Sequence, residues 1–220
     1  MSDQILAASK IQAGERLPIE FFTRTDVVQI ARDLLGQVLV TEFGGLRTVG
    51  RITETEAYRA PDDRACHAWN NRRTARTEVM FREGGRAYIY LCYGIHHLFN
   101  VVTGPENAAH AVLIRAVEPL EGLEIMMARR GWAASGKQRL PALTTGPGAL
   151  SQALGLTTKW SGQPLFDPET PVWIEGWGSR LPDENIVSGK RIGVDSAGLC
   201  AEWPWRFWVK HSPFVKKPLH

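Results

Sequence analysis

Two glycine turns, each between two strand-like runs, constrain the fold of this chain more than any other feature. The runs are rich in β-branched and aromatic residues, and a glycine turn between such runs is typical of a β-hairpin. The turns are Gly44-Gly45, between residues 37–43 and 46–58, and Gly94, between residues 86–93 and 95–102. The sequence therefore predicts two antiparallel hairpins, with Tyr93 near the tip of the second.

Helical patterns are few and do not alternate regularly with the strands. Expected helices are residues 27–35, capped by Thr25 or Asp26, a second from Pro119-Leu120 to about Arg130, and a third at 149–156 after Gly146-Pro147-Gly148. Further short strands are expected at residues 111–116, 172–175, 191–194 and 205–210. Because β-α-β alternation is missing, the pattern favours an α+β fold around an antiparallel sheet over a doubly wound parallel sheet.

Length and composition predict one soluble domain. The chain has 220 residues, 44% of them hydrophobic, which is enough for one sizeable core, and no interior stretch reads as a linker. Residues 1–12 lack the pattern of a signal peptide, and no apolar run approaches a membrane span, so we expect a cytoplasmic protein. The three cysteines include no CxxC pair, which favours a reducing compartment and argues against a zinc ribbon.

The net charge of +3 is too small to establish nucleic-acid binding by itself. The distribution is more informative, because residues 72–86 carry five arginines against Glu78 and Glu83, and Arg129 and Arg130 belong to a second basic cluster. A solvated surface explains any one cluster alone. Together the clusters only modestly favour a surface that follows phosphates.

The stretch from Glu56 to Asn100 combines an acid, ring side chains and arginines. Strict strand alternation puts Ile52, Glu54, Glu56 and Tyr58 on one face of their strand. A carboxylate beside rings can act as a general base toward water, although most strand glutamates simply face solvent. Alternation alone does not choose between Glu54 and Glu56.

Other polar residues in this stretch have ordinary structural interpretations as well. His67 is more often a hydrogen-bonded structural histidine than a ligand, and its spacing from Cys66 and His96-His97 matches no compact zinc site, so no metal is expected. Asn100 and Arg115 lie in apolar strands, where a buried polar side chain needs hydrogen-bond partners. Either neighbouring protein groups or the polar edge of a bound ligand could supply them.

Several segments resemble the alkyladenine (3-methyladenine) DNA glycosylase family, the monofunctional mammalian-type family with bacterial members. These segments are residues 52–58 with Pro61-Asp62-Asp63 and His67, 88–100, 113–122, Gly146-Pro147, 191–194, and 206–209 with Ser212-Pro213. They occur in the family's order from about Pro18 to Val215, which covers nearly the whole chain. One departure is His96, where familiar eukaryotic members carry a tyrosine.

The resemblance implies a role for each matched residue. Glu56 matches the glutamate that activates a water for attack on the sugar carbon of the N-glycosidic bond. Arg115 matches an arginine that helps to hold this acid and the water. The implied base pocket consists of Tyr58, His67, Tyr90 and Asn100, and Asn100 would crowd the exocyclic amino group of guanine.

The resemblance also implies how DNA is held. Tyr93 matches the side chain that inserts into the minor groove and fills the gap left by a flipped base. Further candidates for DNA contacts are Ile95, His96, Arg72, Arg73, Arg76, Arg129 and Arg130.

The expected fold is therefore a single α+β domain with a curved, mostly antiparallel sheet or roll, flanked by helices, and a protruding hairpin that enters the DNA minor groove. The expected bounds are an N-terminal extension at 1–17, a glycosylase domain at 18–216 and a tail at 217–220. The implied enzyme excises 3-methyladenine, 7-methylguanine, hypoxanthine or ethenoadenine from double-stranded DNA in base excision repair, without AP lyase activity. We expect it to act as a monomer, without cofactors, in the cytoplasm at the nucleoid.

Two other functions fit the same residues. A damage-binding protein could flip bases without cleaving them, and a nucleoside hydrolase could use the same acid on free nucleosides. The first would not need Glu56 for catalysis, and the second would not need Tyr93.

Overall fold

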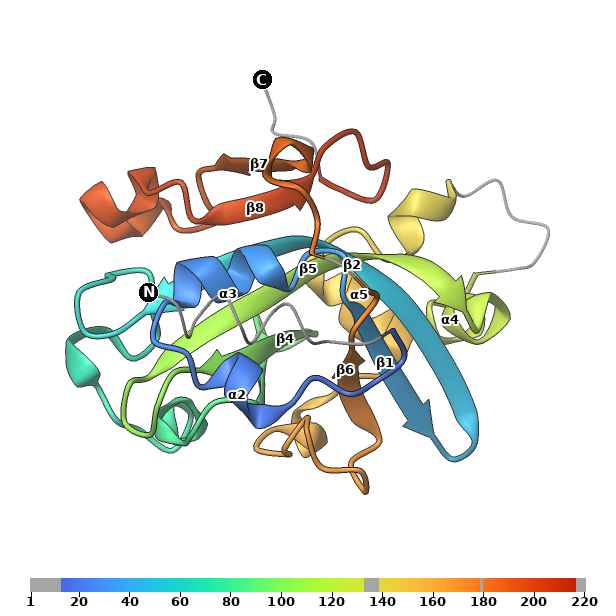
Figure 1. Ribbon diagram of the computed structural model, residues 1–220, viewed down its shortest axis with the longest axis horizontal. Helices are drawn as coiled ribbons and strands as arrows, with labels where there is room; N and C mark the ends of the chain where they lie inside the picture. Colours follow the sequence, from blue (N-terminus) through green and yellow to red (C-terminus); the bar gives the residue numbers. More distant parts are fainter. Residues whose placement is uncertain (1–12, 133–138, 179, 217–220) are drawn as a thin grey trace.

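Eight strands form one antiparallel sheet in the computed structural model, which describes residues 13–132, 139–178 and 180–216 (Figure 1). The strands are β1 Val38–Phe43, β2 Leu46–Arg59, β3 Ala87–Cys92, β4 His96–Thr103, β5 His110–Glu121, β6 Val172–Glu175, β7 Ile186–Gly189 and β8 Arg206–Val209. The main path runs β3-β4-β5-β2-β1-β6, and β8 pairs with both β2 and β7. The predicted single α+β domain with a mainly antiparallel sheet is confirmed.

Among the described residues, four α-helices accompany the sheet: α2 Ile19–Phe22, α3 Val27–Asp33, α4 Leu123–Arg129 and α5 Pro147–Leu154. In Figure 1, α3 lies in front of the sheet and α5 lies behind it. Short 3₁₀ turns occupy Trp69–Asn71, Glu78–Phe81, Leu140–Leu143, Thr158–Trp160, Asp183–Asn185 and Asp195–Glu202. The helices thus lie on both faces of the sheet.

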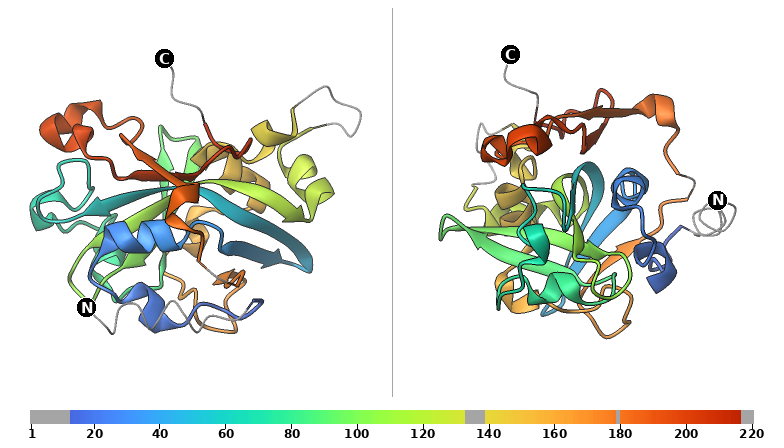
Figure 2. Two further views of the ribbon diagram at one scale, coloured as in Figure 1. Left: turned by 45° about the horizontal axis from the view of Figure 1, so that its top comes forward. Right: turned by 90° about the vertical axis from the view of Figure 1, so that its left-hand side faces the viewer.

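Both predicted hairpins are present. Gly44 and Gly45 join β1 to β2 with φ of 60° and 78°, values that glycine adopts without steric cost. In the second hairpin Cys92 pairs with His96, and the amide of Ile95 donates to the carbonyl of Cys92. The second hairpin projects beyond the rest of the molecule in Figure 2, where it is green.

The cap of α3 resolves one alternative from the sequence. The side chain of Asp26 accepts a 3.0 Å hydrogen bond from the amide of Gln29, so Asp26 rather than Thr25 is the N-cap.

The predicted helix start at Pro119-Leu120 is wrong, because β5 continues to Glu121. Pro119 pairs with Gly50 at a register shift, where a strand tolerates a residue that lacks an amide hydrogen.

Strand β2 is the central element of the fold. One of its edges pairs with β5, while the other pairs first with β1 and then, at residues 54–56, with β8. Both edges are therefore paired at residues 54–56, and the side chains of Glu54 and Glu56 are fully buried. The strand therefore carries two carboxylates through the interior of the protein.

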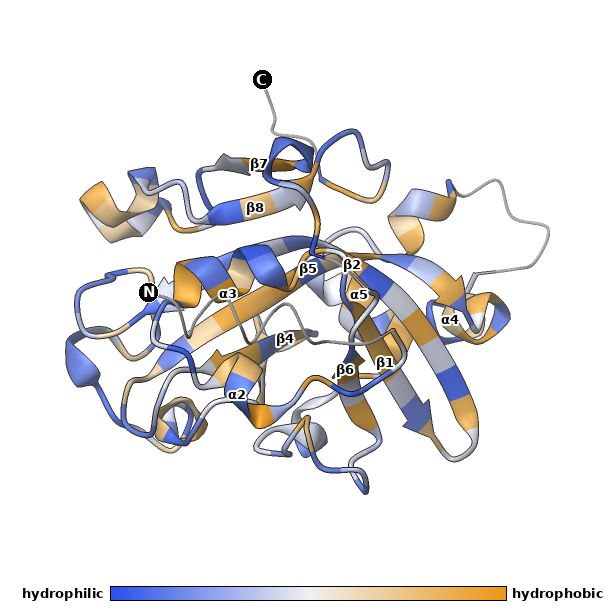
Figure 3. Cartoon of the chain, viewed as in Figure 1, coloured by the Kyte–Doolittle hydropathy of each residue, from blue (hydrophilic) through white to orange (hydrophobic). Residues whose placement is uncertain are grey.

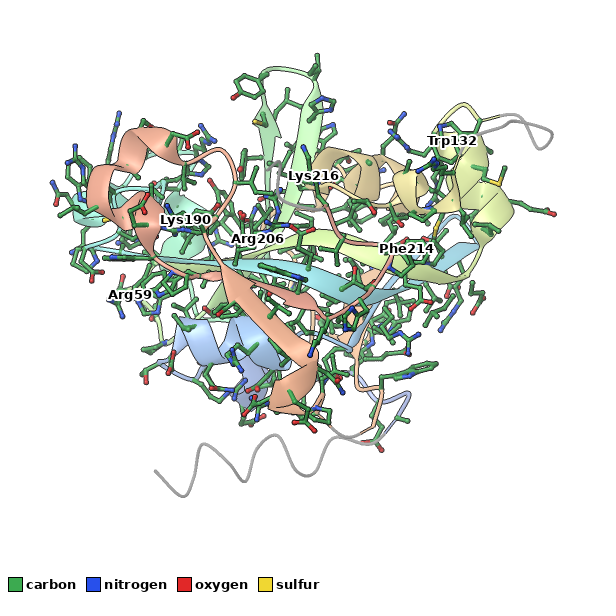
Figure 4. All side chains as sticks on the ribbon, turned by 90° about the horizontal axis from the view of Figure 1, so that it is seen from above. Arg59, Trp132, Lys190, Arg206, Phe214 and Lys216 are labelled. Carbon is green, nitrogen blue, oxygen red and sulfur yellow. The ribbon has the colours of Figure 1, made fainter. Side chains whose placement is uncertain are left out.

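Two bulges interrupt the pairing of β2 with β5 at this point. Ile52 pairs with Val117 and Glu54 with Ala116, so Thr53 is an extra residue on β2, and Arg115 is likewise extra on β5. The expected strict alternation is wrong here, because Thr53 and Glu54 both contact the C-terminal segment: Thr53 donates to the carbonyl of Phe214, and Glu54 accepts from the amide of Lys216. A bulge re-aims side chains in this way. Figure 4 shows Phe214 and Lys216 on the segment that lies over the sheet.

The main core lies between the sheet and its helices. Its largest fully buried side chains include Phe21, Phe22, Phe99 and Ile114. In Figure 3 strand β5 is mostly hydrophobic along its length, and most of the peripheral loops are hydrophilic. Leu17, within the predicted N-terminal extension, is buried and donates its amide to Ile174, while residues 1–12 and 217–220 lie outside the described residues.

Within the described residues, no helix has the length and apolar character needed to cross a lipid bilayer.

Candidate active site

A cavity of about 280 Å³ opens beside the projecting hairpin. Strands β2, β3, β4 and β5 supply most of its walls, and the loop after β7 closes one side. Its lining includes the rings of Tyr58, His67, Tyr88, Tyr90 and Tyr93, the polar side chains of Asn100 and Arg115, and the loop residues Ile192, Gly193 and Val194. The cavity thus brings together all the residues expected in the base pocket.

Three of the rings pack against one another on one wall. His67 meets Tyr90 edge-on, with centroids 4.6 Å apart, and Tyr88 lies 5.6 Å from Tyr90. Burial raises the pKa of Tyr88 to about 12 and also raises the pKa of Tyr90. Both phenols therefore remain neutral near pH 7 and present uncharged ring surfaces to a ligand.

Glu56 lies directly behind the cavity and is held by three donors. Its Oε1 accepts a 2.7 Å hydrogen bond from the amide of Ile192, and its Oε2 accepts from the hydroxyl of Tyr58 at 2.8 Å and from Nη1 of Arg115 at 3.0 Å. All three donor residues line the cavity. The carboxylate is therefore fixed in position next to the space that a ligand would occupy.

The second buried acid, Glu54, has different partners. Its Oε1 accepts from Nε of Arg115 at 2.8 Å and from Nε of Arg206 at 2.7 Å, and its Oε2 accepts from the amide of Lys216. Neither Arg206 nor Lys216 lines the cavity. Glu54 thus anchors β8 and the C-terminal segment, and of the two acids only Glu56 is surrounded by cavity residues.

Arg115 joins the two carboxylates. Burial alone would lower the pKa of Arg115, but the charges of Glu56 and Glu54 outweigh this effect and raise it. Burial and the nearby charge of Glu56 both raise the pKa of the Tyr58 hydroxyl, well above 10. The arginine therefore stays charged and the phenol stays protonated, so each remains a donor to Glu56.

The loop that supplies the Ile192 amide is held by a salt bridge to which the sequence assigned no role. Arg191 donates from Nη2 to Oδ1 of Asp63 at 2.8 Å, and also to the carbonyls of Ala57 and Cys200. Both side chains are fully buried, and the guanidinium lies 4.7 Å from the Tyr58 ring. The predicted strand at 191–194 is wrong, because this segment bends across the cavity while Ile186–Gly189 forms the strand that pairs with β8.

Asn100 is buried in the cavity wall, and both partners of its amide nitrogen are carbonyls. Nδ2 donates to the carbonyls of Tyr88 at 3.1 Å and Leu98 at 3.2 Å. Because carbonyls only accept, these contacts fix the orientation of the amide. The side chain is thus a rigid polar element beside the rings.

A family model described as Methylpurine-DNA glycosylase (MPG) matches residues 20–213. The chain belongs to this family. Among its relatives, a protein of Chlamydia abortus is 48% identical over 87% of this chain and 96% of its own length, and one of Bacillus licheniformis is 45% identical over 93% and 98%. Both are named, provisionally, 3-methyladenine DNA glycosylase.

As a member of the methylpurine-DNA glycosylase family, the chain is a DNA glycosylase and therefore a hydrolase that acts on DNA in repair.

The hairpin between β3 and β4 exposes two large side chains near its tip. Tyr93 at its tip is 92% exposed, and Ile95 is 71% exposed. Tyr93 also has a φ of 51°, in the left-handed region that costs a non-glycine residue about 1 kcal/mol or more. Exposing a large ring in a strained turn does not stabilise the fold.

The arginine candidates of this glycosylase have unequal surroundings. Arg73 is exposed and pairs with Glu78, and Arg130 contacts Gln152 on the surface. Arg129 is half-buried and bonds to the carbonyl of Ala153, whereas Arg72 is exposed. Arg76 differs from all of these, because it contacts two rings of the cavity wall. His96, at the base of the hairpin turn, packs against Gly148 at the start of α5.

Proposed function

We propose that this glycosylase flips 3-methyladenine, 7-methylguanine, hypoxanthine or ethenoadenine out of duplex DNA into the cavity and hydrolyses its N-glycosidic bond. Water, activated by Glu56, would be the nucleophile. Because water rather than a protein amine attacks the sugar, the enzyme would be monofunctional and would leave the sugar-phosphate backbone intact. The residues that carry this chemistry would be Glu56 and Arg115.

One observation carries the proposal: a buried carboxylate is held by three donors that themselves line an aromatic cavity. A fixed carboxylate can accept a proton from water as the water attacks. The same negative charge stabilises the positive charge that develops on the sugar as its bond to the base breaks. One acid would thus serve both needs of the reaction.

The rings supply the binding energy for the flipped base. Flipping costs a few kcal/mol of lost stacking, and least for a damaged or mispaired base. Stacking on aromatic side chains returns roughly 1 to 3 kcal/mol per base. Tyr58, His67 and Tyr90 would hold the base, while Asn100 would obstruct the exocyclic amino group of normal guanine.

The hairpin would hold the DNA open. Tyr93, exposed at the tip, would enter the minor groove and occupy the place of the flipped base, and Ile95 and His96 would contact the neighbouring nucleotides. A side chain that inserts between bases compensates for part of the lost stacking. This role explains why the fold tolerates an exposed ring in a strained turn.

Base release from four duplexes, each with one of the four lesions, tests the proposal when it is read as alkali-labile breaks. The Glu56→Gln variant should lose base release by at least about a hundredfold and keep duplex binding, because the side-chain shape is retained. A melting curve checks that the variant is folded. Unaltered release by Glu56→Gln would exclude the proposed role of this acid.

The two alternatives predict different results. A damage-binding protein would bind all four duplexes and release no base from any of them. A nucleoside hydrolase would act on free nucleosides as fast as on duplexes. Release that requires duplex DNA would exclude both alternatives.

A further inference from the structure

The side chain of Arg76 is exposed to solvent, and its guanidinium packs against two rings of the cavity wall. Its Nη2 is 3.0 Å from Nε2 of His67, and its guanidinium carbon lies 4.7 Å from the centre of the Tyr90 ring. It lines an outer hollow, with Tyr90 and Leu91, and is not among the residues that line the cavity. Tyr90 lines both spaces and therefore separates the guanidinium from a bound base.

The contact with Arg76 fixes the protonation of His67. A guanidinium can only donate, so Nε2 of His67 must accept, and the proton of the neutral ring lies on Nδ1. Nδ1 is 2.9 Å from the hydroxyl of Tyr88 and donates to it. Desolvation by the surrounding side chains and the charge of Arg76 lower the pKa of His67 to about 4. His67 is therefore an uncharged ring near pH 7, held at both nitrogens.

The charge of Arg76 also acts on the base. A cation on the outer face of Tyr90 uses the same ring density that attracts a cationic base on the inner face. The two positive charges also repel each other, and solvent around the exposed guanidinium reduces this repulsion without removing it. A neutral purine such as hypoxanthine experiences neither penalty, whereas 7-methylguanine, which is cationic, experiences both.

We propose that Arg76 is a positioning residue that orients His67 in one tautomer and, by its charge behind Tyr90, biases the pocket toward neutral damaged purines over cationic ones. This proposal rests on the proposed function, since it concerns selection in the same pocket. It differs from the role that the sequence suggested for Arg76, which was contact with a DNA phosphate.

Lesion selectivity tests the proposal. Single-turnover base release is measured for duplexes with 7-methylguanine or hypoxanthine, and the ratio of the two rates is compared among variants. Arg76→Gln removes the charge, so the ratio should shift about fivefold to tenfold toward 7-methylguanine. Arg76→Lys keeps the charge and should keep the ratio within about twofold. Arg73→Gln, three residues away and paired with Glu78 on the surface, is the matched control and should leave the ratio unchanged.

The protonation of His67 provides a second readout that a merely structural role would not change. Nitrogen NMR of the labelled histidine rings should show Nε2 of His67 unprotonated in the unmodified protein. Among the described residues, Arg76, Tyr88 and Tyr90 contact this ring. In Arg76→Gln the pKa of His67 should rise from about 4, because the charge of Arg76, one of the two causes of the low pKa, is removed.

A phosphate contact would give a different pattern. Arg76→Gln would then slow both lesions equally and reduce the slope of log binding constant against log salt by about 1. That result, or an unchanged pKa of His67, would overturn the proposal. Failure of the proposed function is distinguishable, because the unmodified protein would then release neither base.

Discussion

The hydroxyl of Tyr58 donates a 2.8 Å hydrogen bond to Oε2 of Glu56, two residues earlier on β2. A ring that lines the cavity is thereby joined directly to the buried acid behind it. Any movement of the Tyr58 ring on binding a base would be transmitted to the carboxylate. Under the proposed function, base binding and chemistry would thus be coupled through one strand.

Replacing Tyr58 with Phe should slow base release about tenfold, because Glu56 loses one of three donors while the stacking ring remains. Duplex affinity for the lesion should stay within about twofold. Tyr88→Phe is the matched comparison, since its hydroxyl contacts His67 and not Glu56. Equal slowing by the two variants would show that the Tyr58–Glu56 bond has no special role. The measurements are single-turnover release and fluorescence anisotropy.

Glu54→Gln should destabilise the fold strongly. The change leaves Arg115 and Arg206 short of negative charge in the interior, where breaking a buried ion pair costs roughly 3 to 5 kcal/mol. Glu118→Gln is the control, because the Glu118–Arg51 pair is about one-third exposed and such pairs contribute about 0 to 1 kcal/mol. Urea denaturation measures both. Similar unfolding free energies for the two variants would contradict the structural role of Glu54.

The Tyr93→Asn substitution should reduce base excision from duplex DNA and leave the stability of the fold nearly unchanged. Asparagine tolerates the left-handed conformation at φ 51°, and the lost ring is 92% exposed, so the unfolding free energy should change by less than about 1 kcal/mol. Excision from duplex DNA should fall at least tenfold if the ring fills the gap in the stack. Excision from single-stranded DNA should change little. Undiminished excision from duplex DNA would contradict the proposal that Tyr93 fills the gap left by the flipped base.

The low pKa of His67 predicts how stability depends on pH. In the unfolded chain the ring takes up a proton near pH 6.5, but in the folded protein only near pH 4. The unfolded state therefore binds more protons between these values, so the contribution is complete above pH 6.5 and is lost as pH falls toward 4.

The size of this effect is limited because His67 faces the open cavity, where water screens its charge. We expect a loss of about 1 kcal/mol that is absent from His67→Gln. His110, whose pKa is also lowered, contributes to both proteins and cancels in the comparison. Parallel pH profiles of the two unfolding free energies would contradict this assignment.

The sequence by itself determined the local pieces of the fold. Glycine turns and strand-forming runs predicted both hairpins, and the tip position of Tyr93 followed from its neighbour Gly94. These features depend on residues a few positions apart, whose conformational preferences are readable in one dimension. The resemblance of dispersed segments then identified the family and favoured Glu56 over Glu54.

Tertiary structure alone decided how the site is assembled. The paired bulges at Thr53 and Arg115 break the alternation of β2 and aim Arg115 at both carboxylates. Ile192 reaches Glu56 across 136 positions of sequence, and the Arg191–Asp63 pair holds that loop in place. Local patterns carry no signal for such contacts, because register shifts and long-range ion pairs arise only when separate strands pack together.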